Sequence, residues 1–381
     1  MENCEGEKII KLIKKLIKKF IRPTDSKLAF DFPLESLGYL NFKKKFIFNN
    51  VRLYGNSRFV IFDNQAFFLS NNLNQPKFVE KYLTDEECND IIKVKNNTIS
   101  LIFRKLYTKD LEGNTISLTH PNCNNIYHFL FEACFDLIEA HRLNIQFDNL
   151  IIDRQLNSKY YSFLKKIIQA IYPKKKINIL KLPRYKLILV KNLISFPNKN
   201  LQIHWLRNQT TKPMHYWNKI WLTHAQKIFS TLYEEPSKKN IILFLIRNST
   251  FRNTINERSI INLLKKNFFI KILDPTKKSF RSAFYYINTS SIIVGQTSAS
   301  FANILFAKQK KTFITWKYNG PEQNKSLMKE LFLILGHTLI ELDATPVSFQ
   351  ESNLDWQVLH ITQSNLFISP EIVLSALNEK K

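Results

Sequence analysis

Glycine is scarce in this chain of 381 residues, which contains only 7. P-loops and dinucleotide-binding turns need clustered glycines, because their backbone must approach a phosphate group closely. The glycines here are spread along the chain. The sequence therefore excludes both kinds of nucleotide site, and kinases of the Gly-rich-loop type with them.

Cysteine is also rare, and the four cysteines form no Cys-x-x-Cys pair: Cys4, Cys88, Cys123 and Cys134. This argues against a zinc ribbon. Four cysteines in so long a chain are too few for a secreted disulfide scaffold, so we expect a reducing, cytoplasmic compartment. No run of 18 apolar residues occurs either, and no transmembrane helix is expected.

Apolar residues and positive charge are abundant. Hydrophobic residues make up 44% and aromatics 13%, which supplies a large core. The net charge is +25, from 56 Lys and Arg against 31 Asp and Glu, which suits polyanionic partners: nucleic acid, an anionic membrane or phosphorylated substrates. Compositional drift is an equal explanation, because the lysines are scattered. Since no recognised nucleic-acid motif is visible, we expect no nucleic-acid partner, and a basic nucleic-acid-binding protein is kept as an alternative.

Residues 8–22 predict a basic amphipathic helix that ends before Pro23. On a helical wheel, eight apolar residues fill one half and seven Lys or Arg fill the other. That pattern is typical of a helix lying on an anionic membrane surface, so we expect a peripheral protein on the inner face of the membrane. An ordinary surface helix packed on the domain is the alternative.

The order of predicted elements indicates an α/β fold. Residues 24–118 look like short, partly antiparallel strands, whereas from about 119 strands alternate with helices, the first helix spanning 126–142. A continuous apolar run at 240–246 suits a buried parallel strand, and Thr254 to Glu257 matches a capping box for a helix ending at 267. The polar segment 197–215 is the best domain boundary. We expect a doubly wound α/β architecture with a membrane-associating helix at 1–23 and two further α/β domains at 24–205 and 206–381.

Two groups of residues suggest a phosphate site at one sheet edge. The loop at 295–300 follows a strand and opens a helix, where small and hydroxyl side chains let a ligand reach free backbone N–H groups. Arg247 and Arg252 follow the neighbouring strand, and a guanidinium suits phosphate oxygens. A plain helix N-cap and two solvated arginines are the simpler interpretations of each group taken alone.

His120, His128 and Glu132 form a third group. His128 and Glu132 are four residues apart on a predicted helix, so they share a face, and a carboxylate beside a histidine can orient it as a general base. No third metal ligand is obvious. By spacing alone, an ordinary helix ion pair is the favoured interpretation.

Taken together, these stretches resemble glycosyltransferase family 61. Its first signature corresponds to the stretch from Asn125 to Glu132, which includes His128. Its second, a strand ending in Arg followed by Arg and Asn-Glu, is matched by Arg247, Arg252, Asn256 and Glu257. Its third, Gly-x-His-Gly-Ala-x-Leu-x-Asn, is matched by Gly295, Ala299 and Asn303, with Thr297, Ser298 and Phe301 replacing the family's His, Gly and Leu.

The resemblance implies an inverting glycosyltransferase of the two-Rossmann, GT-B type. The donor would be a nucleotide sugar held by the second and third signatures, and His128 with Glu132 would be catalytic. The acceptor would be a glycan, and the basic first helix favours a lipid-linked one from capsule or lipopolysaccharide synthesis. No Asp-x-Asp sequence occurs, so we expect no metal and no cofactor, with arginine and helix dipoles neutralising the diphosphate. A non-catalytic, nucleotide-binding relative stays possible because Thr297 replaces the family His.

Overall fold

The computed structural model describes sixteen stretches of the chain. These are residues 28–33, 38–39, 46–55, 59–62, 65–68, 92–95, 98–103, 105–106, 110–120, 123–183, 186–196, 217–234, 241–247, 253–317, 327–347 and 365–380. The predicted membrane helix at 8–22 and both predicted domain boundaries lie outside these residues.

The N-terminal half is built on a mixed sheet with the strand order β11-β10-β9-β12-β3-β4-β5-β2. Its parallel part consists of β9 (Leu111–Ser117), β10 (Asn149–Asp153), β11 (Asn178–Leu182) and β12 (Lys186–Ser195). Its other strands are β2 (Gly38–Tyr39), β3 (Phe46–Tyr54), β4 (Phe59–Phe62), β5 (Gln65–Phe68) and β8 (Lys105–Leu106). The strand β3 pairs antiparallel with β12 and with β4, and β4 pairs antiparallel with β5. A separate antiparallel sheet holds β1 (Leu28–Pro33), β6 (Ile92–Lys95) and β7 (Thr98–Phe103). The prediction of short, partly antiparallel strands before residue 118 is confirmed.

The C-terminal half contains a five-stranded parallel sheet with the order β14-β13-β15-β16-β17. The strands are β13 (Ile241–Leu245), β14 (Ile270–Leu273), β15 (Ser290–Gln296), β16 (Thr312–Lys317) and β17 (Thr338–Asp343). The crossovers contain α7 (Glu257–Asn267), α8 (Phe280–Thr289), the 3-10 helix η3 (Ala299–Phe306) and α9 (Leu327–Ile334). A small hairpin-like pair, β18 (Thr345–Val347) and β19 (Asn365–Phe367), precedes α11 (Pro370–Asn378). Every pair in the five-stranded sheet is parallel, as expected for a doubly wound α/β fold.

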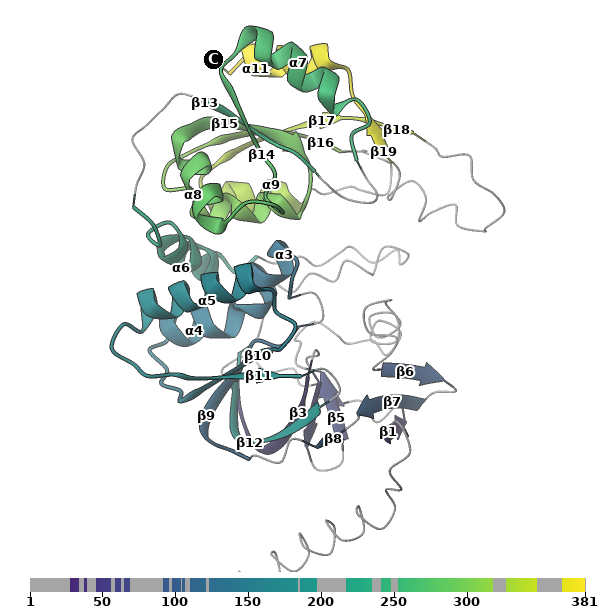
Figure 1. The fold of residues 1–381 in the computed structure, drawn as a ribbon, viewed down its shortest axis with the longest axis vertical. Coiled ribbons are helices and arrows are strands. Elements are labelled where there is room, and N and C mark those ends of the chain that lie inside the picture. The colour runs from purple at the N-terminus through teal and green to yellow at the C-terminus, as the bar shows by residue number, and fades with distance from the viewer. Residues whose placement is uncertain are drawn as a thin grey trace, which may run out of the picture.

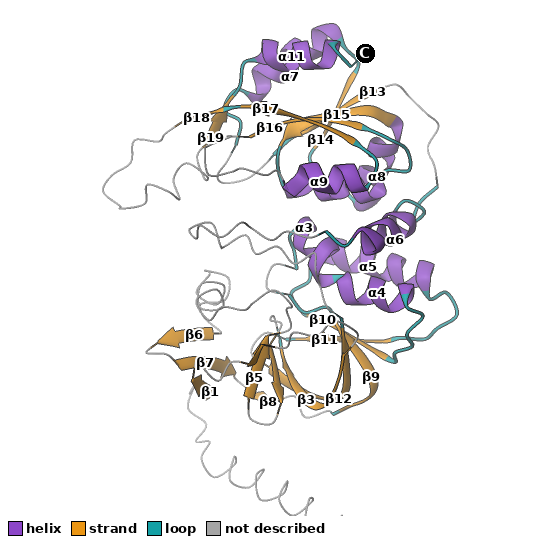
Figure 2. Cartoon of the chain, turned by 180° about the vertical axis from the view of Figure 1, so that it is seen from behind, coloured by secondary structure: helices purple, strands orange, loops and turns teal. Residues whose placement is uncertain are grey.

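A layer of helices lies between the two sheets (Figures 1 and 2). It contains α4 (Phe135–Arg142) and α5 (Ser158–Ile171) from the first half, α6 (Lys219–Phe229), and α8, η3 and α9 from the second. Buried apolar side chains of all these helices form one continuous core. A second core packs α7 and α11 on the outer face of the C-terminal sheet. No helix in the described stretches combines the length and the hydrophobicity needed to span a bilayer.

The helix predicted at 126–142 is interrupted. It consists of α3 (Ile126–His128), a π-helical segment η2 (Phe129–Ala133) and α4. The π turn adds a residue to the helical repeat, which changes the direction in which the following side chains project. Such segments are frequent at functional sites.

The predicted capping box at Thr254 is wrong. The helix begins at Glu257 with Asn256 as its N-cap, so Glu257 is the first helical residue instead of the third. The Thr254 hydroxyl donates to Gln296 Oε1 at 2.9 Å and accepts from Trp316 Nε1 at 2.7 Å. A tertiary hydrogen-bond network therefore takes the side chain that local patterning assigned to the cap.

Candidate active site

Glu132 is the centre of a group of three titratable side chains. Its Oε2 lies 2.9 Å from Nδ1 of His128 and 2.6 Å from Nε2 of His120. The two imidazole rings are stacked, with centroids 5.5 Å apart and 20° between their planes. One carboxylate oxygen therefore faces both rings. We call His120, Glu132 and His128 the His–Glu–His cluster.

The two histidines reach the carboxylate from different elements. His120 follows β9 at its carboxyl end, and its backbone N–H donates to Oδ2 of Asp153, the last residue of β10, at 2.8 Å. His128 ends α3, whose N-cap Asn125 accepts a hydrogen bond from the N–H of Tyr127. The cluster thus stands at the carboxyl edge of the parallel part of the N-terminal sheet, where ligands bind in open α/β sheets.

The carboxylate is buried and one histidine is partly open. Side-chain exposure is 3% for Glu132, 1% for His120 and 22% for His128. Burial raises the pKa of Glu132, but the charges of His128 and His120 and their hydrogen bonds outweigh it, so the pKa lies well below its usual range. Glu132 is therefore a carboxylate at neutral pH, stable in the interior because it is paired. The contact has the predicted i,i+4 spacing, but it is not the ordinary surface ion pair favoured from the sequence.

Among the described residues, these three side chains could surround a metal ion, because their ligand atoms all lie within 4.8 Å of one another. Ligand atoms of a tetrahedral zinc site are about 3.3 Å apart, which follows from bonds of about 2.0–2.1 Å. The separations of 2.6 and 2.9 Å are shorter and match direct, charge-assisted contacts. The arrangement is thus that of a carboxylate held between two imidazoles.

Arg247 and Thr297 lie together at the carboxyl edge of the C-terminal sheet. Arg247 follows β13 and its Nη1 donates to the Thr297 carbonyl oxygen, after β15, at 3.1 Å. The Thr297 hydroxyl lies 2.8 Å from that of Thr315 on β16. The helices after these neighbouring strands, α7 and η3, pack on opposite faces of the sheet. In doubly wound sheets this reversal opens the crevice that binds ligands.

Two further predicted residues support this edge. A Cβ on Gly295 would lie 2.5 Å from the carbonyl oxygen of Leu245, so only glycine allows β13 and β15 to approach this closely. Glu257 Oε1 accepts the backbone N–H of Arg247 at 3.4 Å. Burial raises the pKa of Glu257, which the hydrogen bond from Arg247 opposes. Both residues therefore shape the turn that carries Arg247.

The remaining predicted residues differ in their environments. Asn256 donates to the carbonyl of Ile368 at 2.7 Å, which joins the start of α7 to the segment before α11. Asn303 is buried on η3 and donates to the Ser300 carbonyl. Ser298 and Ala299 are half-buried where η3 begins. Arg252 lies outside the described residues.

The two sheet edges meet through α3 and η3, which are in contact. Figure 1 shows α3 at the side of the N-terminal half that faces the C-terminal half. The end of α3 carries His128, and η3 continues directly from the Thr297 turn. The contact therefore brings the histidine-bearing signature beside the Ser/Thr-rich one, although about 170 residues separate them in the chain.

These features define an α/β protein with a histidine–carboxylate cluster at the edge of one sheet and a turn that carries Arg247 at the edge of the other. Residues 126–314 match the family model described as Glycosyltransferase 61. The chain belongs to this family and is a glycosyltransferase, an enzyme class whose substrates are in general a nucleotide-sugar donor and a glycan acceptor. No curated protein matches the chain.

The sequence places His120 in the third group of candidate residues but indicates no role for it. His120 precedes the helix that carries His128 and Glu132, and helical spacing does not relate it to either. The signal that could have found it is the strand at Leu111–Ser117, because a residue just past the carboxyl end of a parallel strand is well placed for a site.

Proposed function

We propose that this chain is an inverting glycosyltransferase that moves a sugar from a nucleotide-sugar donor to a hydroxyl group of a glycan acceptor. The observation that supports this best is the contact of α3 with η3. The helix that ends at His128 packs against η3, which begins two residues after Thr297. In this proposal the His–Glu–His cluster would remove a proton, and the turn with Arg247 and Thr297 would receive a leaving anion.

The donor diphosphate would bind at the crevice between β13 and β15. Arg247 supplies a guanidinium whose orientation is fixed by its bond to the Thr297 carbonyl. The start of η3 supplies backbone N–H groups, and Ser298 supplies a hydroxyl. These donors would neutralise the charge of the leaving diphosphate without a metal ion or another cofactor. Arg252, Asn256, Glu257, Gly295, Ala299 and Asn303 would complete or support this site.

His128 would be the general base. If the Glu132 carboxylate accepts the Nδ1 proton, the neutral ring holds its lone pair on Nε2, which can take the proton of the acceptor hydroxyl. The acceptor oxygen then forms a bond to the anomeric carbon while the bond to the diphosphate oxygen breaks on the opposite face. The nucleoside diphosphate leaves with the electron pair, and the configuration inverts.

The basic N-terminal segment supports a proposal for the acceptor and the location. We propose a GT-B-like enzyme with an acceptor domain at 24–205 and a donor domain at 206–381. It would be anchored by residues 1–23 at the cytoplasmic face of the membrane. There it would meet a lipid-linked glycan of capsule or lipopolysaccharide synthesis.

Substitutions of Arg247 and of His128 separate donor binding from chemistry. Arg247→Ala should weaken nucleoside-diphosphate binding by about 10- to 100-fold, because a charge-assisted hydrogen bond is worth about 1.5–3 kcal/mol. Arg247→Lys should restore only part of it, since an ammonium cannot make the forked contact. Calorimetric titration against a panel of nucleoside diphosphates and nucleotide sugars measures both, with Arg258→Ala on the exposed side of α7 as the matched control.

His128→Ala should leave nucleotide affinity nearly unchanged and lower turnover by roughly 10²-fold or more, the usual range for a general base. Turnover is followed as nucleoside diphosphate released from the donor that binds in the panel. If His128→Ala abolishes nucleotide binding while Arg247→Ala leaves it intact, the roles assigned to the two edges are wrong.

A further inference from the structure

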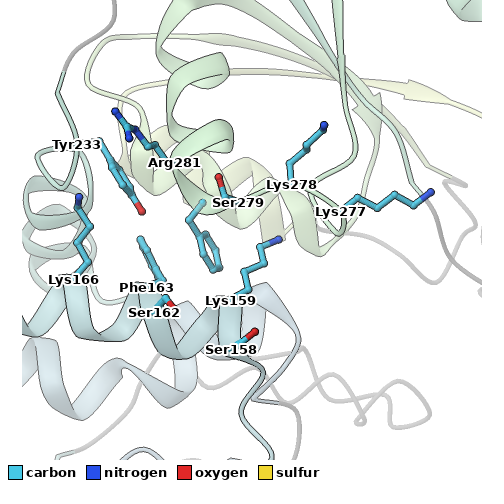
Figure 3. Close-up of a pocket in the computed structure, with 11 residues that line it drawn as sticks. Ser158, Lys159, Ser162, Phe163, Lys166, Tyr233, Lys277, Lys278, Ser279 and Arg281 are labelled. Carbon is cyan, nitrogen blue, oxygen red and sulfur yellow. The ribbon is translucent and has the colours of Figure 1, made fainter.

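A groove with a volume of about 530 Å³ lies where α5 of the N-terminal half faces the start of α8 in the C-terminal half. Figure 3 shows that the side chains lining it come from both halves, with Lys277 and Lys278 extending outward from it. None of the residues assigned above to catalysis or donor binding lines this groove. It is therefore a separate feature of the junction.

Five basic side chains line the groove. Lys159 and Lys166 come from α5, Lys277 and Lys278 from the loop after β14, and Arg281 from the first turn of α8 (Figure 3). No acidic residue is among its lining residues, which are all described. Two acids lie beside the groove: the buried Asp274, whose Oδ2 lies 3.7 Å from the Lys277 ammonium, and Glu234, which lines the adjoining cavity with Lys166 and Arg281. Even with that pairing, the lining of the groove keeps a net positive charge, which favours an anion near it.

Part of the groove is already ordered. The ammonium of Lys159 donates to the carbonyl oxygen of Pro275 and lies 5.1 Å from the ring centroid of Phe280. This bond joins α5 of one half to the loop of the other. Three serine hydroxyls also line the groove, and the N-terminal end of α8 adds positive partial charge.

The floor of the groove connects it to the catalytic cluster. Phe163 and Phe280 are stacked with ring centroids 4.2 Å apart. Phe163 also packs against Phe129, the residue that follows His128, with centroids 6.4 Å apart. One layer of aromatic rings therefore lies between the groove and the helix that carries the proposed base.

We propose that this groove binds a phosphate or diphosphate group that bridges the two halves of the molecule. Ammonium, guanidinium and hydroxyl donors around an open groove with an aromatic floor are the chemistry that recognises a phosphate attached to a larger body. A soluble phosphorylated substrate and a lipid headgroup both carry such a group. The site uses no residue of the proposed donor site, so either can exist without the other.

The test is calorimetric titration of the full chain with inorganic pyrophosphate, performed in the Arg247→Ala background to weaken binding at the donor edge. The triple variant Lys277→Ala, Lys278→Ala, Arg281→Ala should bind pyrophosphate at least about tenfold more weakly, because it loses charge-assisted contacts. The matched control, Lys265→Ala, Lys266→Ala, Lys271→Ala, removes the same charge from exposed positions outside the groove and should bind as the background does. Thermal unfolding of each variant checks that it is folded.

Equal affinities in the groove variant and the control would overturn the proposal, whether both retain binding or both lose it. Calorimetric titration with a short-chain, water-soluble phosphatidylglycerol then separates the sources of the phosphate, because vesicles would also bind the basic segment at 8–22. Loss of phosphatidylglycerol binding in the groove variant, but not in the control, identifies a lipid headgroup. Weakened pyrophosphate binding in the groove variant, with no phosphatidylglycerol binding in the control, identifies a soluble phosphate.

Discussion

A buried carboxylate between two imidazoles dominates the chemistry at the residue scale. A charged Glu132 in the interior costs several kcal/mol unless it is paired, and His120 and His128 provide that pairing. His120 is buried, whereas His128 is partly exposed. The cluster therefore has one histidine enclosed with the carboxylate and another whose side chain is partly open to solvent.

Glu132→Gln tests whether this carboxylate orients the proposed base. The amide keeps the shape of the side chain but removes its charge, so turnover should fall by about 10²-fold or more while nucleotide affinity stays unchanged. Turnover and calorimetric titration measure the two effects. His120→Ala should lower turnover less than His128→Ala, because His120 acts through the carboxylate.

A requirement for metal would contradict this assignment. Wild-type turnover should persist in EDTA, since the charge of Glu132 is paired by protein groups. If EDTA abolished activity and added divalent metal restored it, His120, His128 and Glu132 would be ligands instead of a base and its supports.

At the scale of the elements, the close approach of β13 to β15 sets the spacing of Arg247 and Thr297 at the proposed donor site. Gly295→Ala would place a methyl group against the Leu245 carbonyl and force the strands apart. We expect a loss of about 1–3 kcal/mol in the free energy of unfolding, typical of overpacking, together with weaker nucleotide binding, because Arg247 and Thr297 separate. Urea denaturation and calorimetry measure these changes.

Gly336→Ala is the control for this substitution. Gly336 has a φ of +76° and no atom within 4 Å of the added Cβ, so alanine brings only a conformational penalty of about 1 kcal/mol. Nucleotide binding should not change. Equal nucleotide affinity in both variants would show that the spacing of β13 and β15 does not govern the donor site.

His337 joins three elements and gives stability a pH dependence. Its Nδ1 accepts the Lys311 N–H at 3.1 Å before β16, and its Nε2 lies 3.2 Å from Gln226 Nε2 on α6. Burial, together with the positive charge of Lys311, lowers the pKa of His337 to about 4. The unfolded value is about 6.5, so the native state excludes a proton that the unfolded chain binds.

This contribution is fully present above pH 6.5 and is lost as the pH falls toward 4, by up to about 3 kcal/mol at 1.36 kcal/mol for each pKa unit. Asparagine can replace Nδ1 as an acceptor without titrating. The Tm of His337→Asn should therefore fall less steeply than that of the wild type between pH 7 and pH 5 in thermal unfolding. Parallel slopes would refute the role of this histidine.

At the scale of the whole molecule, both halves share one hydrophobic core. Helices from each half contribute to a continuous apolar cluster between the two sheets. The indole of Trp221 on α6 is fully buried and donates to the Phe135 carbonyl on α4 at 3.3 Å. Mutations in this layer should therefore destabilise both halves together.

The membrane anchor is the remaining prediction at this scale. Deleting residues 1–22 should release the protein from vesicles that contain phosphatidylglycerol and leave nucleotide binding intact. The segment carries seven Lys or Arg and three Glu, a net charge of +4, so +21 of the +25 remains after deletion. If the truncated protein still sediments with the vesicles, general positive charge, and not this segment, causes the binding.

Local sequence patterns determined much of the secondary structure. The apolar run at 240–246 contains the strand Ile241–Leu245. The predicted helix that ends at 267 spans Glu257–Asn267 and begins two residues later than the capping box placed it. Ser369 caps the helix that starts with Pro370, a start signal that also depends only on neighbouring residues. Burial periodicity and capping depend on neighbours in sequence, so these elements are readable from the chain alone.

Only the tertiary structure decided how the site is assembled. Spacing related His128 to Glu132 but could not relate either to His120, because that contact depends on where β9 ends beneath α3. Likewise Thr254 looked like a cap, yet Gln296 and Trp316 engage its hydroxyl group. The family signatures follow from residue order. The packing of α3, which ends at His128, against η3 of the third signature is a long-range contact that no local pattern specifies.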